Sequence, residues 1–392
     1  MKFAESWGLS DMRHKLFEMV ANANTGADAI KRAPIVSENT GLRCLRIGDV
    51  SQGRPFSEWG FTKTTDDDFN KYQLKAGDTI IARTGNTIGV NTYIDAELQS
   101  VYNNGLIRIQ VNQDVIHPRY FYYLVRSKGC QDFIQSIAFG TSTQPNMKIK
   151  DFLQYEFEYF DKDVQDKIIR IIDPIEEKIK LNNEINSNLE QQAYSIYQAM
   201  FSSDNQPNGV LSDIADITMG QSPSGDSLNE ENGTVFYQGR TDFTFRFPSV
   251  RLFTTEPKRM ALKNDVLLSV RAPVGDINVA LDDCCIGRGL AAIHSKDNKQ
   301  SFVYYTVKAL YPAFDMFNGE GTVFGSINKI ALNSMPIYIP DIDEIDKFEH
   351  LVSPMDRLIL ENHQENIRLQ GIRDSLLPKL MSGEIDLSSV SI

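Results

Sequence analysis

The chain has 392 residues, of which 41% are hydrophobic and 23% charged, and its formal net charge is −12. This composition is typical of a globular protein, and the length allows two or three domains with separate cores. No apolar run is long enough to cross a membrane and the first residues do not resemble a signal peptide, so we expect a cytoplasmic protein without membrane association. The four cysteines lack metal-binding spacing and are expected to be reduced thiols.

The negative charge is unevenly distributed. Residues 161–201 and 341–392 carry net charges of −3 and −6, whereas residues 1–160 hold 18 basic and 18 acidic side chains. The larger regions could therefore still present a local basic face. Charge alone neither supports nor excludes DNA binding.

Residues 1–160 are predicted to form a first mixed α/β domain. Strand-like runs at 79–82 and 106–111 alternate with turn residues, and a helix is expected at 118–137. Its loops combine basic, amide and aromatic side chains, the types that contact bases and phosphates. Each could instead form a surface salt bridge, and the aromatic residue could belong to the core. The candidate DNA-binding residues are Arg46, Arg54, Trp59, Lys63, Arg83, Thr84 and Asn86.

Residues 161–203 are predicted to form a first coiled-coil helix region. From Ile168 to Met200, positions spaced alternately by four and three residues form an unbroken seam. Asn182 and Asn186 occupy this seam, where buried asparagines would select a register by pairing; the alternative is that they face solvent. Asp173-Pro174 is typical of a helix start, so we expect a short preceding helix and a break at the proline.

From Pro174 to Met200 this helix would be about 40 Å long. This length is close to one turn of B-DNA, roughly 34–36 Å, the separation at which two domains meet the same face of a duplex. A helical hairpin inside a globular core is the alternative.

Residues 204–340 are predicted to form a second domain of the same kind. Strands are expected at 266–270 and 336–340, with a helix at 301–317. The candidate DNA-binding residues are Gln238, Arg240, Arg246 and Arg271.

Residues 341–386 are predicted to form the second coiled-coil helix region, which is followed by a tail at 387–392. Asn362 and Asn366 occupy its seam, and a helix start is expected at Ser353-Pro354. Gly383 is expected to end the helix.

The two halves of the chain repeat one another. The run from Pro174 to Leu189, including both asparagines, recurs 180 residues later, and Asp78 recurs as Asp265. The pairs Gly140-Thr141 and Lys148-Ile149 recur after 181 residues as Gly321-Thr322 and Lys329-Ile330. The repeat predicts two copies of one unit with pseudo-twofold symmetry. We therefore expect an α+β protein with two mixed α/β domains, separated by two long antiparallel coiled-coil helices.

No pattern of catalytic residues is found. The chain lacks a phosphate-binding loop and the Asn-Pro-Pro-aromatic motif of amino-methyltransferases, and its five histidines have no metal-ligand spacing. The stretch from Gly287 to Ala292 mimics a dinucleotide fingerprint, but the residues after it read as a strand. We expect no catalytic residue, metal or cofactor in this chain.

Three segments resemble the specificity subunit of type I restriction–modification enzymes. They are residues 376–385 (LLPKLMSGEI), 182–190 (NNEINSNLE) and 268–276 (LSVRAPVGD). The first domain departs from the pattern, because Arg83-Thr-Gly-Asn stands where the second has Arg271-Ala-Pro-Val. In this family, domains that read different sequences are expected to differ in this way. The departure prevents the transfer of single residue roles from the family to this chain.

The resemblance implies a DNA-recognition subunit without catalysis of its own. Each target-recognition domain would read one half of a bipartite, asymmetric sequence in double-stranded DNA, and the helix pair would set the gap. Two modification (methyltransferase) subunits would dock on the helices, and restriction subunits would join them. S-adenosylmethionine, ATP and Mg would then be bound by the partner subunits only.

Two other classes of function remain open from the sequence. The chain could be a nuclease or methyltransferase that works without partners through an unrecognised site. It could also be a coiled-coil scaffold that binds only proteins.

Overall fold

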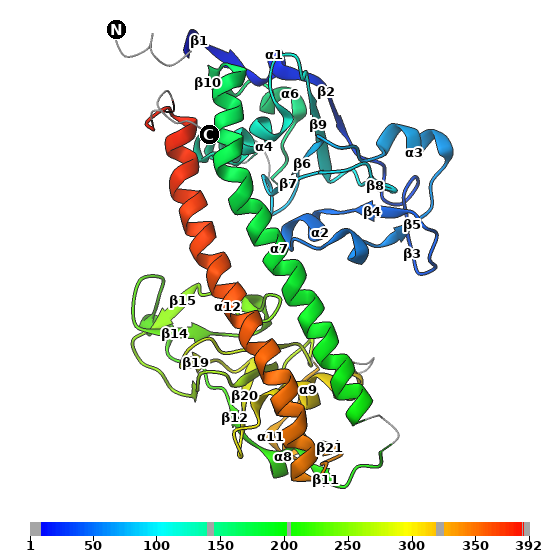
Figure 1. Ribbon diagram of the computed structural model, residues 1–392, viewed down its shortest axis with the longest axis vertical. Coiled ribbons are helices and arrows are strands. Elements are labelled where there is room, and N and C mark those ends of the chain that lie inside the picture. The colour runs from blue at the N-terminus through cyan, green and yellow to red at the C-terminus, as the bar shows by residue number, and fades with distance from the viewer. Residues whose placement is uncertain (1–8, 139–144, 202–204, 319–324, 386, 388–392) are drawn as a thin grey trace. The chain divides into compact units, whose positions relative to one another are not determined.

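The computed structural model describes residues 9–138, 145–201, 205–318, 325–385 and 387, which form two compact units. Unit 1 comprises Met1–Lys180 and Glu365–Ile392, and unit 2 comprises Leu181–Gln364. The helices α7 (Lys162–Met200) and α12 (Ile342–Met381), green and orange-red in Figure 1, each contribute to both units. Each unit thus contains a mixed α/β head and a part of each helix, whereas the sequence division separates heads from helices.

Some predicted features lie outside the described residues. These are the Gly-Thr pairs at 140–141 and 321–322 and the tail apart from Leu387, whose side chain is buried.

The head of unit 1 contains two four-stranded sheets, ordered β2-β9-β6-β7 and β3-β5-β4-β8, and the separate pair β1-β10. Neighbouring strands are antiparallel except β4 and β8, which are parallel. Its strands are β1 (Leu9–Lys15), β2 (Val20–Thr25), β3 (Ile35–Val36), β4 (Arg43–Leu45), β5 (Phe61–Thr62), β6 (Thr79–Ala82), β7 (Asn91–Tyr93), β8 (Ser100–Tyr102), β9 (Leu106–Val111) and β10 (Glu156–Phe160). Its helices are α1 (Leu16–Met19), α2 (Ile47–Ser51), η2 (Phe56–Glu58), α3 (Asp66–Tyr72), α4 (Pro118–Arg126), α5 (Lys128–Ala138) and α6 (Ile149–Phe152).

The head of unit 2 repeats this topology and adds one edge strand, β16, to the second sheet; its sheets are ordered β12-β20-β17-β18 and β13-β15-β14-β19-β16, with the pair β11-β21. Here β14 and β19 form the parallel pair. Its strands are β11 (Gly209–Val210), β12 (Ala215–Met219), β13 (Leu228–Asn229), β14 (Thr234–Tyr237), β15 (Leu252–Thr254), β16 (Met260–Ala261), β17 (Val266–Ser269), β18 (Ile277–Val279), β19 (Cys284–Ile286), β20 (Leu290–Ser295) and β21 (Pro336–Ile337). Its helices are α8 (Leu211–Ile214), η3 (Gly225–Ser227), η4 (Arg240–Asp242), α9 (Gln300–Ala309), α10 (Tyr311–Asp315), η5 (Met316–Asn318) and α11 (Lys329–Asn333).

The shared topology confirms the predicted internal repeat and the mixed α/β character of both heads. The helix predicted at 118–137 is divided into α4 and α5, and the one predicted at 301–317 into α9, α10 and η5. The strand expected at 336–340 is limited to β21.

Both faces of the central strand β6 are buried, which explains why its sequence is apolar without alternation. Ile81 faces the core that includes α4 and α5, whereas Ile80 and Ala82 face the core between the two sheets. In β17 of unit 2, Leu268 and Leu267 are divided between two cores in the same way. Because side chains alternate across a strand, burial of both faces requires a continuous apolar run.

The helix starts predicted at the two prolines are wrong, and so is the break predicted at the first. α7 continues through Pro174 and α12 continues through Pro354. The turns before the first proline bury Ile168 and Ile172 completely in the core of unit 1. Burial of two such side chains stabilises these turns by about 1.5–3 kcal/mol each. This gain offsets the roughly 3 kcal/mol that an internal proline costs a helix.

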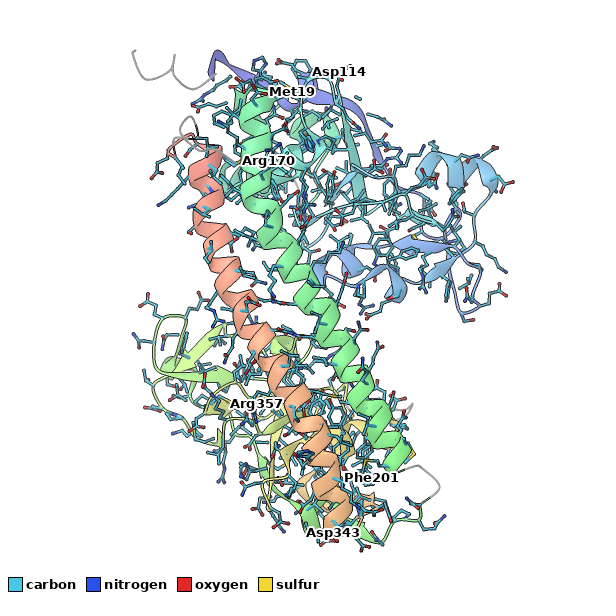
Figure 2. All side chains as sticks on the ribbon, viewed as in Figure 1. Met19, Asp114, Arg170, Phe201, Asp343 and Arg357 are labelled. Atoms are coloured by element: carbon cyan, nitrogen blue, oxygen red, sulfur yellow. The ribbon has the colours of Figure 1, made fainter. Side chains whose placement is uncertain are left out.

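The helices run antiparallel in unit 2. Phe201, just after α7, lies at the same end of the pair as Asp343 near the start of α12 (Figure 2), and its ring contacts Phe348 at 5.5 Å between centroids. Further along, Asn362 donates a 2.8 Å hydrogen bond to Asn186 Oδ1, and Asn186 donates to the carbonyl of Ile359. All four seam asparagines are buried, which excludes the solvent-facing alternative.

The amide pair leads to a prediction about stability. Asn362→Leu should lower the free energy of unfolding by about 1–3 kcal/mol, because Asn186 loses its partner inside the seam. Adding Asn186→Leu should recover most of this loss, since two leucines at these seam positions leave no amide without its partner and pack against each other. Urea unfolding of both variants checks the prediction, and losses that simply add would show that the pair does not act together.

His363 on α12 makes the stability of unit 2 depend on pH. Its ring packs on Phe247 at 4.7 Å between centroids, and burial lowers the pKa of His363 from its usual value of 6.5. As the pH drops through about 6.5, the imidazole of His363 therefore binds a proton more readily in the unfolded chain than in the folded chain. The free energy of unfolding falls as a result. We expect the unfolding midpoint of the natural protein to fall more between pH 7.5 and 5.5 than that of His363→Gln. An equal fall in both proteins would contradict the assignment.

None of the helices in the described residues combines the length and apolar character needed to cross a bilayer. All four cysteines are buried and free.

Candidate nucleic-acid interface

Three loops of unit 2 lie side by side where β14, β17 and β19 end. Val270, after β17, donates its N–H to the carbonyl of Gly289 at 2.9 Å. Gly289 in turn donates to the carbonyl of Gln238, after β14, at 3.3 Å, and Gly287 donates to Tyr237 at 2.8 Å. These backbone bonds join the loops into one surface, which we call the unit 2 edge.

Glycines allow this close approach. A Cβ atom at Gly289 would lie 2.8 Å from the carbonyl oxygen of Gln238, and one at Gly287 would lie 3.0 Å from its Cα. Gly287 and Gly289 join β19 of the five-stranded sheet to β20 of the four-stranded sheet, so the stretch that mimics a dinucleotide fingerprint opens no helix. The strand expected after it is confirmed as β20.

Two predicted candidates project from the unit 2 edge. The side chains of Gln238 and Arg271 are exposed and have no hydrogen-bond or ion-pair partner among the described residues. Arg288, between the two glycines, and Gln221, after β12, are exposed in the same way. Gln221 belongs to this edge because its N–H donates to the carbonyl of Ile286 at 2.9 Å.

Arg288 and Gln221 were missed by the sequence-based prediction. The signal for Arg288 was present, because an arginine between two glycines that separate apolar strands indicates a tight turn with an exposed side chain. For Gln221 no comparable local signal exists.

The other two candidates of unit 2 are engaged within the protein. Arg240 is half exposed and pairs with Asp276. Arg246 is only 4% exposed, pairs with Glu190 at 3.3 Å and Asp356 at 2.7 Å, and lies 3.4 Å from the ring centroid of Tyr304. Burial acts to raise the pKa of Glu190, but Arg246 and Lys308 outweigh it, so the net shift is downward. We therefore do not retain Arg246 as a DNA contact.

In unit 1, the loop after β6 carries three candidates. Arg83 donates a 2.9 Å hydrogen bond to Asn146, and Thr84 forms a backbone bridge with the same residue. Asn86 is exposed beyond Gly85, whose φ of +80° suits glycine. The N–H of Arg83 donates to Gly105 at 3.0 Å, which joins this loop to the one after β8.

Two of the remaining candidates of unit 1 surround one acidic side chain. Arg46, before α2, and Arg54 lie 3.4 and 3.6 Å from the carboxylate of the buried Asp49.

The other two candidates of this head are also engaged within the protein. Lys63 forms an exposed ion pair with Glu38. Trp59 is 6% exposed, and its indole N–H donates to the carbonyl of Arg54 at 2.9 Å. Because its ring belongs to the core, Trp59 is not retained.

The sequence-based equivalence of Arg83 and Arg271 is wrong by one position. The N–H of Val270 donates to Gly289 as that of Arg83 donates to Gly105, so Val270 is the counterpart of Arg83. Thr84 therefore stands where unit 2 has Arg271. The register of β6 and β17 fixes this equivalence, whereas the sequence alignment matched arginine with arginine.

An acid–histidine pair in unit 2 resembles part of a catalytic site. Asp265 lies 2.6 Å from Nδ1 of His294, and its carboxylate also accepts the N–H of Leu262. In unit 1, Gln110 donates to Asp78 at 2.7 Å in the same arrangement. Unit 1 thus has a glutamine where unit 2 has the histidine, and the side chain still bonds the equivalent aspartate. We therefore assign the pair a structural role in both heads and no catalytic one. The described residues hold no group of three potential metal ligands.

Comparison with known proteins gives a consistent result for both halves. The family model described as type I restriction modification DNA specificity domain matches residues 20–191 and again 208–370. A proposed MjaX type I restriction enzyme specificity subunit of Methanocaldococcus jannaschii is 25% identical, over 97% of this chain and 94% of its own. The HindI specificity subunit of Haemophilus influenzae is 24% identical, over 80% of this chain and 88% of its own.

One solved structure shows the same fold. The S subunit of a type I restriction–modification system from M. genitalium gives a TM-score of 0.54 at 16% identity, and the match covers 97% of this chain and 98% of that chain.

Proposed function

Because the chain belongs to the family of type I restriction–modification DNA specificity domains, we propose that it selects the DNA sequence on which such an enzyme acts. The observation that carries this proposal is the double match, in which each copy covers most of one α/β head and most of the long helix that follows it. Two heads on one chain suit a target in two parts. Each head reads one half of a bipartite, asymmetric sequence in double-stranded DNA.

The helix pair supplies the spacing between the half-sites. Both α7 and α12 run from one compact unit into the other, and their seams carry asparagines at matching positions. A coiled-coil seam with polar positions fixes one register of the two helices. The helices therefore set the number of unspecified base pairs.

The helices also offer surface for partner subunits. On α12, Leu351 and Leu358 in unit 2 and Ile367 and Ile372 in unit 1 are 40–51% exposed. Exposed apolar side chains along one element favour protein contact. Two modification subunits dock here and bring S-adenosylmethionine, while restriction subunits bring ATP and Mg. Because its ligand is DNA, the complex acts in the cytoplasm.

Mapping of methylated adenines tests this function. The chain is co-expressed with its modification subunits, and modified adenines in the host DNA are located by sequencing. We expect them to share one sequence with two defined parts and a fixed gap. Methylated adenines without a common sequence would contradict the proposal.

The purified chain alone should neither methylate nor cut DNA, since we assign all chemistry to the partners. Turnover by the chain alone, abolished by a point mutation in it, would instead favour the alternative of an enzyme with an unrecognised site.

A further inference from the structure

Both heads build their edge on the same backbone framework. In unit 2, Gly287 donates to the carbonyl of Tyr237, and in unit 1, Asn103 donates to that of Leu45, both within 3.0 Å. The residues that follow these two carbonyls, Gln238 and Arg46, therefore occupy equivalent positions. We call this position A.

Two further positions follow from the bonds of the next loops. Val270 donates to Gly289 at 2.9 Å as Arg83 donates to Gly105 at 3.0 Å. The residues after these donors, Arg271 and Thr84, define position B. The residues before these acceptors, Arg288 and Asn104, define position C.

Side chains at the three positions differ while the backbone stays the same. In unit 2, positions A, B and C hold Gln238, Arg271 and Arg288. In unit 1 they hold Arg46, Thr84 and Asn104. All six are at least partly exposed. A constant framework with variable polar side chains is what two readers of different sequences require.

The chemistry of these side chains is that of direct base readout. Arginine pairs with guanine O6 and N7, glutamine and asparagine pair with adenine, and threonine contacts the thymine methyl group or a polar base edge. We propose that positions A, B and C are base-reading positions in both heads, an inference that rests on the proposed function. Unit 2 reads adenine through Gln238 and guanines through Arg271 and Arg288.

Unit 1 reads fewer guanines. Its only arginine at the three positions is Arg46, which shares the carboxylate of Asp49 at 3.4 Å. Thr84 and Asn104 suit thymine and adenine. The half-site of unit 2 is therefore richer in G·C pairs than that of unit 1.

Exchange of side chains between the heads tests the inference. Arg288→Asn and Gln238→Arg each introduce the residue that unit 1 carries at the same position, so the backbone framework accommodates them. The full chain, in complex with its modification subunits, is used to select duplexes from a random library. Lys296→Ala is the control, because Lys296 lies beyond the opposite end of β20.

The expected result is a change of one base at one place. Arg288→Asn should convert one guanine of one block into adenine, and Gln238→Arg should convert one adenine of that block into guanine. The discrimination should change by about 5- to 150-fold, the range of one bidentate pair. The other block and the Lys296→Ala selection should stay unchanged.

Other outcomes overturn the inference. Unchanged motifs, or a uniform loss over all sequences, would make these side chains bystanders or phosphate contacts. Continued selection of the other block shows that the complex is assembled, and circular dichroism shows that the variant is folded. If the natural protein itself selects no sequence, the proposed function fails, and that outcome is distinct from failure of the variants alone.

Discussion

Arg246→Met is expected to lower the free energy of unfolding of unit 2 by about 3–5 kcal/mol. The guanidinium is buried between the carboxylates of Glu190 on α7 and Asp356 on α12, over the ring of Tyr304. Methionine fills a similar volume but leaves two largely buried acids, of which Glu190 still has Lys308 as a cation at 2.8 Å. An uncompensated buried charge is far costlier than the loss of a surface pair.

Urea unfolding measures this loss, and Arg259→Met is its control. Arg259 lies in the same head, is exposed and has no ion-pair partner among the described residues, so its replacement should stay within about 0.5 kcal/mol. Adding Glu190→Gln and Asp356→Asn to Arg246→Met should recover part of the loss, because the unpaired charges are removed. A loss of under 1 kcal/mol for Arg246→Met would contradict the account of this cluster.

Insertion of seven residues into both long helices is expected to lengthen the unspecified gap in the DNA target by about three base pairs. Seven residues preserve the alternating spacing of the seam and add about 10.5 Å of helix. B-DNA rises by roughly 3.4 Å per base pair, which converts this length to the expected gap. The insertions follow Lys180 in α7 and Gln364 in α12, where one compact unit gives way to the other.

Methylation mapping of the complex with the lengthened chain reads out the new gap. Insertion into α7 alone is the matched control, since it shifts one seam against the other and should abolish selective methylation. The two half-sites themselves should keep their bases in the doubly lengthened protein. An unchanged gap in that protein would refute the role of the helices as a spacer.

Features set by local pattern could be predicted from the sequence. The strands β6 and β9 begin and end where the apolar runs do, and the two seams place asparagines where Asn186 and Asn362 pair. Periodicity reports which face of an element is buried, and burial drives the folding of these elements.

Features set by distant partners could not be predicted. Arg246 follows an aromatic stretch and Arg271 follows a strand, and both look like loop arginines in the sequence. Only Arg271 is exposed. The difference comes from Glu190 and Asp356, which are 56 and 110 residues away from Arg246 along the chain. The same limit applies to Pro174, because the core that holds its helix together includes residues of α12.

The candidate interface could be predicted only in part. Sequence reasoning found Gln238 and Arg271, but it retained the buried Trp59 and missed Arg288. Backbone hydrogen bonds between loops decide which side chains share an edge, and single loops do not reveal these bonds.

Selection from a random duplex library by the natural chain, in complex with its modification subunits, tests the central claim most directly. Two heads that each read a half-site predict two short defined blocks at one fixed gap, with the block of unit 2 richer in G·C pairs. A single contiguous block, or no enriched sequence with the complex intact, would contradict the account of a two-headed reader.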